Sequence, residues 1–475
     1  MLFAACDNYD DFTDAPDATL RFSADTVSFD TLFASVPSVT KTLIVWNDAD
    51  KGVRIRDVRI ENGKSTYYRV NVDGEYLDGS LRDLEIRAGD SLFVFAEITL
   101  EAVVGGASKD SVTVDDALLF TLSNGKTQRV ALHTTAVNAE IYPDGMTIKA
   151  DTLFTNDSKR VIYGALRVEK GATLTLEAGT TLYFHTGAEL HVYGSLVSKG
   201  TLEQPVTLRG DRLDRLFKNL PYDNTVGRWG GVHIHGSSPS NELTYTDIHS
   251  GDYGVVVDSS QVVMDGCILH NIGGNGLVLL SSNAAVSNCQ FSNTRGNCVS
   301  VYGGASDFMF CTMAQYYPWE ADRGAALFIG DYLLDIQAPI ESALFTSCLM
   351  TGYADDVLMG DIKNEKSGPY QFRNCVLRTP EVPNDSHYVN VVWELPKNDP
   401  KEDDKLPKQG YRQFALMDLD NFLYDFRPFA SSHAANAADP EDVKYSPKDR
   451  LGVLRKDSIT AGCYQTIPNK EEEKK

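Results

Sequence analysis

The sequence predicts an all-β protein in which an antiparallel sandwich precedes a parallel β-helix. The first observation is an internal repeat, because residues 261–282 and 283–304 align over 22 positions, with Cys267 over Cys289 and Asn271 over Asn293. Short apolar alternations at a fixed period of this size, punctuated by Gly and Asn, are typical of a stacked β-solenoid. The second observation is that residues 18–138 alternate apolar and polar residues between turn signals without any such period.

Residues 18–138 carry about seven short alternating segments, which predict an immunoglobulin-like sandwich. Turn signals separate these segments, and Asn124-Gly125 is the clearest of them. We expect a type I′ hairpin turn there, because Asn and Gly tolerate the two positive φ angles that this turn requires. No catalytic constellation marks the segment, so we expect it to act as a spacer or a protein contact.

The β-helix begins with glycines at seven- to eight-residue intervals, from Gly164 through Gly171 and Gly179. The pieces between them are strands of three to five residues, and three such sides close one coil. A solenoid exposes the apolar end of its last coil, so we expect the C-terminal segment to cap it. The predicted segments are an acidic tether at 1–17, the sandwich at 18–138, a linker at 139–160, the right-handed β-helix at 161–395, a charged loop at 396–410, a C-terminal coil and cap at 411–466, and a solvated tail at 467–475.

Cysteines recur at the period of the coils. Cys267, Cys289 and Cys311 are expected to form one inward column. Neighbouring strands lie about 4.8 Å apart, a spacing that suits disulfide geometry poorly, so buried free thiols are predicted. No spacing of Cys and His typical of zinc is present. We therefore predict neither a metal site nor a cofactor.

Charge argues against nucleic acid as a partner, and hydropathy argues against a membrane-spanning helix. The formal net charge is -22 with no compensating basic cluster, so nucleic acid is not an expected partner. No run of 18 apolar residues is present, and no membrane-spanning helix is expected.

The first residues end in Ala4-Ala5-Cys6, which is similar to the end of a bacterial lipoprotein signal. Lipidation of Cys6 is therefore expected, with the acidic segment after it as an unstructured tether.

Taken together, these features resemble the right-handed parallel β-helix lipoproteins of the Bacteroidota and, more distantly, the pectate-lyase-like superfamily. The resemblance implies a lipid-anchored outer-membrane protein exposed at the cell surface, and Asp7 and Asp10-Asp11 loosely resemble a surface-export signal. It spans nearly the whole chain and is more specific for architecture than for function. Its motifs are Ala4–Cys6, Asp25–Phe33, Leu174–Phe184, Arg228-Trp-Gly-Gly, and Asp449 with Gly452 and Arg455.

An enzyme of this fold needs carboxylates in adjacent coils or a pair at a defined separation. At the 22-residue period, Asp247 is followed by Leu269, so no carboxylate column is predicted there. Asp355, Asp356 and Asp361 lie in a less regular region and keep a polysaccharide lyase or glycoside hydrolase open as the alternative. No reaction centre is otherwise expected.

The histidines can be interpreted either as metal ligands or as structural residues. His233 and His235 alternate on one strand face, but a metal site would need a third converging ligand. His249 lies 22 residues before Asn271 and is interpreted as the head of an Asn ladder that satisfies turn backbone groups. The histidines are therefore predicted to be structural.

An aromatic excursion interrupts the repeat and is the best candidate for binding. Tyr316, Tyr317 and Trp319, with Arg323, supply faces that stack on sugars or anchor a protein interface, unless they only pack on the solenoid. We therefore expect a non-catalytic surface lipoprotein that binds glycan or serves as an accessory subunit of an outer-membrane protein complex.

Overall fold

The computed structural model describes residues 11–63, 67–101, 111–217, 220–333, 336–363, 367–394 and 413–468. The chain divides into two compact units, Met1–Ala139 and Glu140–Lys475, and each is described by itself. The expected lipidation site Cys6 and the expected charged loop at 396–410 lie outside the described residues. No helix in the described ranges is long and apolar enough to cross a membrane.

The first unit is a β-sandwich of two five-stranded sheets whose inward side chains form one apolar core. Pairing is antiparallel except between β2 and β10, and the predicted sandwich is confirmed. One sheet has the order β1 (Arg21–Phe22), β3 (Lys41–Trp46), β8 (Ser91–Ile98), β5 (Tyr68–Val72) and β6 (Glu75–Tyr76), and the other has β2 (Thr26–Phe33), β10 (Thr127–Val137), β9 (Ser111–Leu122), β4 (Val53–Ile60) and β7 (Ser80–Ile86).

The hairpin predicted at Asn124-Gly125 joins β9 to β10 and is confirmed, but its turn type is not. Gly125 has a φ of 87°, whereas Asn124 is not among the residues with positive φ. Gly125 N donates to Leu122 O at 3.0 Å and Leu122 N to Lys126 O at 2.8 Å. A three-residue loop with one left-handed glycine satisfies the same strand twist as the expected type I′ turn.

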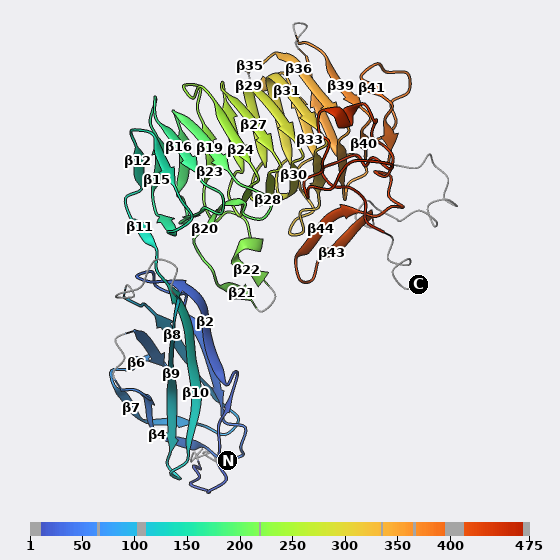
Figure 1. Ribbon diagram of the computed structural model, residues 1–475. Helices are drawn as coiled ribbons and strands as arrows, with labels where there is room; N and C mark the ends of the chain where they lie inside the picture. The colour runs from blue at the N-terminus through green and yellow to red at the C-terminus, as the bar shows by residue number, and fades with distance from the viewer. Residues whose placement is uncertain are drawn as a thin grey trace, which may run out of the picture. The chain divides into compact units, whose positions relative to one another are not determined.

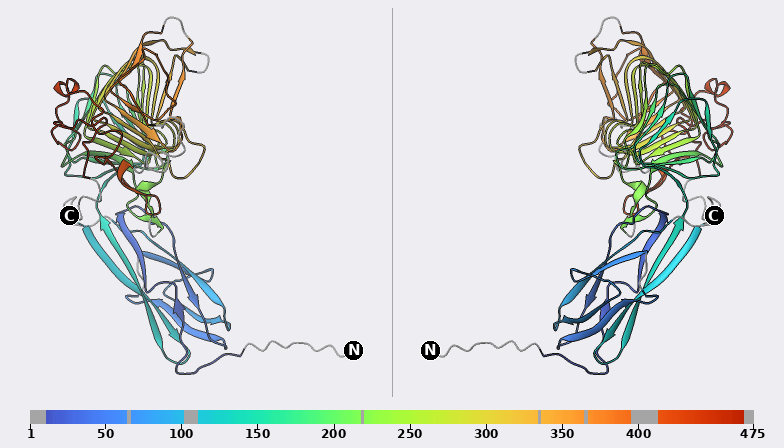
Figure 2. Two further views of the ribbon diagram at one scale, coloured as in Figure 1. Left: turned by 90° about the vertical axis from the view of Figure 1, so that its right-hand side faces the viewer. Right: turned by 90° about the vertical axis from the view of Figure 1, so that its left-hand side faces the viewer.

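The second unit is a parallel β-helix (Figure 1). A regular coil contributes one strand to an 11-stranded sheet and two strands to a 17-stranded sheet, as in the coil that contains β25, β26 and β27. In some later coils the two strands of the larger sheet merge into one, as in β29 and β31. In Figure 2, strands that hold the same place in successive coils lie behind one another, because each strand pairs in parallel with its counterpart one coil on. The predicted three-sided coil is thereby confirmed.

The strands of the β-helix are short, and most have three to five residues. The 11-stranded sheet contains β11 (Glu140–Tyr142), β14 (Arg160–Ile162), β17 (Thr181–Phe184), β20 (Val206–Gly210), β25 (Thr246–His249), β28 (Ile268–Ile272), β30 (Gln290–Thr294), β32 (Thr312–Gln315), β37 (Leu349–Gly352), β40 (Val376–Leu377) and β42 (Val392–Trp393). The 17-stranded sheet contains β12 (Met146–Ile148), β13 (Thr152–Phe154), β15 (Ala165–Val168), β16 (Thr173–Leu176), β18 (Glu189–Val192), β19 (Ser195–Lys199), β23 (Gly231–Ile234), β24 (Asn241–Thr244), β26 (Val255–Asp258), β27 (Gln261–Asp265), β29 (Leu277–Ser287), β31 (Val299–Met309), β33 (Leu327–Gly330), β36 (Ile340–Thr346), β38 (Leu358–Asp361), β39 (Tyr370–Arg373) and β41 (Tyr388–Val389).

Within the described ranges, excursions from the coils carry three two-stranded hairpins and two short 3-10 helices. The hairpins pair β21 (Arg215–Phe217) with β22 (Leu220–Pro221), β34 (Tyr332–Leu333) with β35 (Ile336–Gln337), and β43 (Phe414–Asp418) with β44 (Leu423–Pro428), and the 3-10 helices are η1 (Tyr222–Asn224) and η3 (Asp442–Lys444).

The segment expected to be a linker is instead the first coil. Residues of β11 pair with β14, those of β12 with β15 and those of β13 with β16, so the β-helix starts at Glu140 and not at 161. Ile148 and Phe154 of this coil are buried in the same core as the later coils. Residues 139–160 contain a single glycine, Gly145, so the glycine interval that marks the later coils does not reveal this one.

The predicted cysteine column is confirmed. Cys267, Cys289 and Cys311 are buried free thiols, and Cys348 and Cys375 continue the series. The backbone N of Cys267 donates to Cys289 Sγ at 3.3 Å, one coil on. The thiols therefore act as small apolar side chains that also accept weak hydrogen bonds along the solenoid.

The C-terminal segment, residues 413–468, covers the outer face of the 11-stranded sheet. Ala314, Leu349 and Val376 point outward from β32, β37 and β40 and share a buried cluster with Phe414 and Phe426 of the hairpin β43–β44. The segment was expected to cap the open end of the solenoid. Instead, these outward apolar positions need cover, and the segment supplies it along the side of the coils.

Candidate functional site

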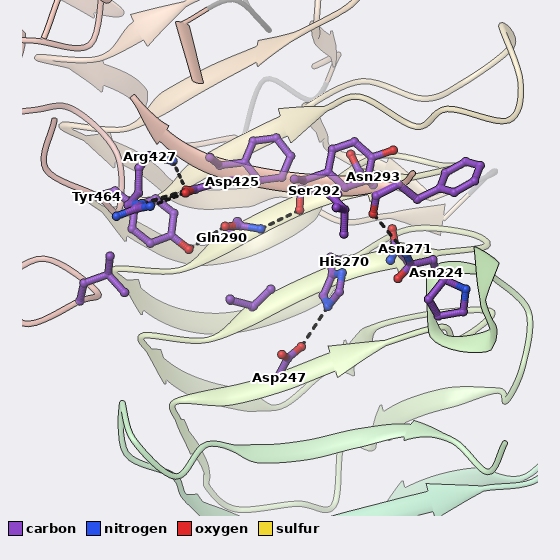
Figure 3. A pocket seen from close by; sticks show the side chains of 17 residues that line it. Asn224, Asp247, His270, Asn271, Gln290, Ser292, Asn293, Asp425, Arg427 and Tyr464 are labelled. Atoms are coloured by element: carbon purple, nitrogen blue, oxygen red, sulfur yellow. Dashed lines mark hydrogen bonds and ion pairs between the residues drawn. The ribbon is translucent and has the colours of Figure 1, made fainter. Parts of the chain in front are cut away.

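A cavity of about 720 Å³ lies between the 11-stranded sheet and the hairpin β43–β44. Its floor is the outer face of β25, β28 and β30, its roof is the hairpin, and Pro221 and Asn224 of the insertion after β20 close one side (Figure 3). Asn224 Nδ2 donates to the carbonyl of Phe422 at 3.1 Å, so the insertion and the hairpin are in direct contact. Ligand pockets of proteins have volumes of this order.

The pleat of the strands decides which side chains reach the cavity. Ile248 of β25 and Leu269 of β28 are buried in the core, so Asp247 and His270 point outward from the same strands. The register pairs Asp247 with Ile268 and His249 with His270, a spacing of 21 residues. His249 and His270 therefore stand beside each other on one outer face.

This register corrects the interpretation of His249 as the head of an Asn ladder. Ser250, with a φ of 64°, holds the left-handed turn position that Asn271 and Asn293 hold in the next coils. Its backbone N donates to Asn271 O at 3.0 Å. The 22-residue step, which pairs β26 with β29 and β28 with β30, is one residue too long for the pairing of β25 with β28, and a one-residue slip moves a side chain to the other face.

Asp247 lies between two imidazoles at the floor of the cavity. Its Oδ1 is 3.2 Å from His249 Nδ1 and 3.2 Å from His270 Nε2. Although burial opposes ionisation, the charges and hydrogen bonds of the two histidines hold the pKa of Asp247 well below its usual range. Burial alone would lower the pKa of His249, but the neighbouring carboxylates of Asp223 and Asp247 raise it to about 9. The group is therefore a carboxylate flanked by two imidazoles on the outer face of the sheet.

A second carboxylate, that of Asp223, lies on the far side of His249 from Asp247. Asp223 of η1 places Oδ2 3.7 Å from His249 Nε2, and Arg209 of β20 holds its Oδ1 at 2.5 Å. The Asp223 carbonyl also accepts a hydrogen bond from Ser250 Oγ at 3.2 Å. The insertion after β20 is thus fastened to the same coil that carries Asp247.

The roof contributes a carboxylate, a guanidinium and aromatic rings. Asp425 pairs with Arg427 on β44, with Nη2 to Oδ2 at 2.5 Å. Tyr464 donates its hydroxyl to Gln290 Oε1 of the floor at 2.7 Å, so roof and floor are bonded directly. Phe422 and Tyr424 line the same cavity. Carboxylates, amides and aromatic faces together suit a ligand rich in hydroxyl groups.

The residues predicted as a binding patch lie elsewhere, next to the roof. Tyr316 and Tyr317 are buried, Tyr316 within the cluster beneath the C-terminal segment, so neither can stack on a ligand. Trp319 is 42% exposed and stacks on Phe422 at 4.5 Å, and Arg323 Nη1 donates to the Tyr317 carbonyl at 2.9 Å. Burial removes the two tyrosines from the predicted patch, while binding by Trp319 and Arg323 stays a prediction.

A second cluster of histidines lies on the outer face of the 17-stranded sheet. His191 of β18 pairs in register with His233 of β23, and His191 Nδ1 lies 3.1 Å from His235 Nε2. His191 Nε2 lies 2.8 Å from Glu189 Oε2. Burial lowers the pKa of all three histidines, and a chain of hydrogen bonds toward Glu189 accounts for the arrangement without a ligand.

Sequence reasoning missed the residues that the cavity brings together. Asp223, Asp247 and His249 fall in one irregular stretch, and His270 was read only as part of the repeat. Asp425 and Arg427 come from the segment expected to be a cap. One signal was available, because Asp-x-His at 247–249 precedes a second histidine by about one coil.

Comparison with family models supports the β-helix of the second unit. Residues 151–312 match the family model described as a right handed beta helix region. No curated protein matches. Among solved structures, the chain is similar to the catalytic unit of a thermostable GH87 alpha-1,3-glucanase from Streptomyces thermodiastaticus, with 11% identity over 74% of this chain and 72% of that one, at a TM-score of 0.24.

Two further solved structures are similar to parts of the chain. A GH87 alpha-1,3-glucanase catalytic domain in complex with nigerose is 10% identical over 74% of this chain and 80% of that one, with a TM-score of 0.19. A family 123 glycoside hydrolase from Clostridium perfringens is 9% identical over 29% of this chain, at a TM-score of 0.20, and this chain spans only 30% of its length.

These findings correct the prediction of a non-catalytic protein. The two structures that overlap about three quarters of this chain are catalytic units of glycan-cleaving enzymes, which favours the alternative, a glycan-acting enzyme. At TM-scores below 0.5, the likeness carries neither a mechanism nor a substrate over to this chain. A reaction has to be justified from the residues of the pocket.

Proposed function

We propose that this protein is a glycan-cleaving hydrolase and that the cavity beneath β43–β44 is its active site. The observation that carries the proposal is the presence of two carboxylates in one cavity, Asp247 on the floor and Asp425 on the roof. Hydrolysis of a glycosidic bond commonly uses two carboxyl groups that flank the bond, one to protonate the leaving oxygen and one to activate water or attack the sugar.

The environments of the two carboxyl groups suggest their roles. Asp247 is held ionised by its two histidines, which suits a base or nucleophile. Asp425 is then the second carboxyl group of the pair, and Arg427 fixes its orientation through contacts of Nε and Nη2 with Oδ2. Asn271, Asn293 and Gln290 line the cavity and offer amide groups to sugar hydroxyls.

The substrate is expected to be a neutral glycan. A net charge of -22 repels polyanionic chains such as polyuronates at a distance. Aromatic side chains of the roof, Phe422 and Tyr424, supply faces on which sugar rings stack. Stacking of this kind does not require a charged substituent.

Incubation of the purified protein with a panel of neutral glucans, including an α-1,3-glucan, tests the proposal by release of reducing ends. Asp247→Asn and Asp425→Asn should each lower kcat by at least about 100-fold, the usual contribution of a general acid or base. Asp258→Asn, at an exposed carboxylate on β26 of the other sheet, is the matched control and should leave the rate unchanged. Absence of product from every glycan, or full rates in both pocket variants, would refute the assignment.

Attachment at the outer membrane through a lipid on Cys6 stays part of the proposal on the sequence alone. Cys6→Ser should move the protein from the detergent phase to the aqueous phase in phase separation, and protease treatment of intact cells reports surface exposure. Retention of the variant in the detergent phase would contradict the anchor.

A further inference from the structure

We propose that Asp247, His249 and His270 bind one divalent transition-metal ion, with Zn²⁺ as the reference ion, at the floor of the cavity. The ligand atoms are Asp247 Oδ1, His249 Nδ1 and His270 Nε2, which all lie within 4.8 Å of one another. They come from β25 and β28, adjacent strands of the rigid parallel sheet. The role of the ion in turnover rests on the proposed function, whereas its binding does not.

The spacing of the three atoms fits a coordination sphere. Zn²⁺ binds imidazole nitrogen and carboxylate oxygen at about 2.0–2.2 Å, so neighbouring ligand atoms lie roughly 3.0–3.5 Å apart. Asp247 Oδ1 is 3.2 Å from each histidine nitrogen. The rings of His249 and His270 have centroids 4.9 Å apart and are inclined at 45°, so their nitrogen atoms can converge on a point beside Asp247.

The far side of His249 has the support that metal-bound histidines usually have. Its Nε2 is buried, makes no hydrogen bond and lies 3.7 Å from Asp223 Oδ2. A histidine that binds metal through one nitrogen commonly donates its other N–H to a carboxylate, which fixes its tautomer and orientation. Asp223 is positioned for this role, because Arg209 holds its other oxygen at 2.5 Å.

The other side of the group opens into the cavity. Asp247 and His270 line it, with side chains 26% and 28% exposed, whereas His249 is 9% exposed. Three protein ligands leave at least one coordination position for water or a substrate oxygen, which is the pattern of catalytic and not of structural zinc sites. In the proposed hydrolase, an ion held by these residues would supply an activated water on the side of the cavity that Asp247 lines.

The donor atoms also select the kind of ion. Two imidazoles with one carboxylate suit Zn²⁺, Co²⁺, Ni²⁺ or Cu²⁺, whereas Ca²⁺ and Mg²⁺ prefer oxygen ligands throughout. The histidine cluster on the 17-stranded sheet is a weaker candidate. There His191 directs its two nitrogens to different partners, His235 and Glu189, so they do not converge.

Titration of the full chain, freed of metal by chelator and dialysis, with Co²⁺ and Zn²⁺ tests the proposal by calorimetry and by the visible absorption of Co²⁺. One ion per chain is expected. His270→Ala and His249→Ala should weaken binding at least about 100-fold, and Asp223→Asn about 10- to 100-fold. The matched control is His191→Ala, which removes a histidine of the other cluster and should leave affinity unchanged.

Each outcome of the titrations either supports or refutes the proposed metal site. The proposal is overturned if no ion binds at millimolar Co²⁺ or Zn²⁺, if His270→Ala and His249→Ala bind as the parent does, or if only His191→Ala loses the ion. Retained thermal unfolding temperature in Asp223→Asn separates loss of a ligand contact from loss of fold. Metal binding without glycan turnover would refute only the proposed function, and turnover that survives chelation would refute only a catalytic role of the ion.

Discussion

Asp442→Asn is expected to release the C-terminal segment from the β-helix. Asp442 of η3 is 2% exposed, and its carboxylate joins the segment to two loops of the coils. Oδ2 accepts hydrogen bonds from Ser347 Oγ and Asn374 Nδ2, both at 2.8 Å, and Oδ1 accepts one from Arg373 Nη2 at 2.9 Å. An amide has only one acceptor oxygen, so the substitution sets its NH₂ group against donors.

The expected loss of stability in this segment is about 3 kcal/mol. A hydrogen bond to a charged group contributes about 1.5–3 kcal/mol, and two buried ones are affected. The bond to Arg373 adds little, because that side chain is 46% exposed and screened by solvent. The amide oxygen still accepts one bond, which keeps the total near the lower end of the range.

Native-state hydrogen exchange measures this opening directly. The amides of Gly462 and Cys463 donate to Ser347 O at 2.8 Å and to Thr312 Oγ1 at 3.0 Å, so they exchange only when the segment leaves the sheet. A loss of about 3 kcal/mol corresponds to roughly 150-fold faster exchange. Glu441→Gln, at an exposed carboxylate paired with Lys444, is the matched control and should change exchange less than about threefold. Equal effects of the two variants would refute the reasoning.

Two further predictions concern the roof and the pH dependence of stability. Tyr464→Phe removes the buried hydrogen bond to Gln290 and should lower the free energy of unfolding of the second unit by about 1–2 kcal/mol, measured by denaturant titration; an unchanged midpoint would show that water replaces the hydroxyl. Burial lowers the pKa of His191, His233 and His235 from the ordinary 6.5, so the unfolded chain binds protons more tightly than the folded one. The free energy of unfolding should therefore be highest above about pH 6.5 and fall as the pH drops from there through the lowered pKa values of the folded chain. Replacing all three histidines by Asn should make the urea midpoint depend less on pH between pH 7.5 and 5.

The repeat predicts the fold well because its physical basis is local. Val255, Leu277 and Val299 pair in register at successive 22-residue steps, as the sequence alignment requires. Each coil packs mainly on its neighbours, so apolar periodicity and turn residues are enough to specify the stack. The same alignment fails on the neighbouring side of the first of these coils, where β25 pairs with β28 at a step of 21 residues and Asp247 pairs with Ile268.

This difference of one residue in register is why the sequence did not reveal the candidate site. At a step of 22 residues, His249 aligns with the turn residue Asn271, and Asp247 aligns with Leu269, whose side chain points into the core. In the actual register, Asp247 and His270 both face outward into the cavity. Because side chains alternate between faces, an error of one residue exchanges core for surface, and no composition or spacing argument corrects it.

The sequence by itself determined the all-β character, the sandwich, the stacked coils and the free cysteine column, since each depends on neighbours along the chain or one coil away. Only the tertiary structure decided the site. It joins Asp223, Asp247 and His270 to Asp425 and Tyr464, which lie up to about 240 residues apart. The physical reason is the outward apolar face of β32, β37 and β40. That face draws residues 413–468 along the side of the β-helix, where they form the roof of the cavity.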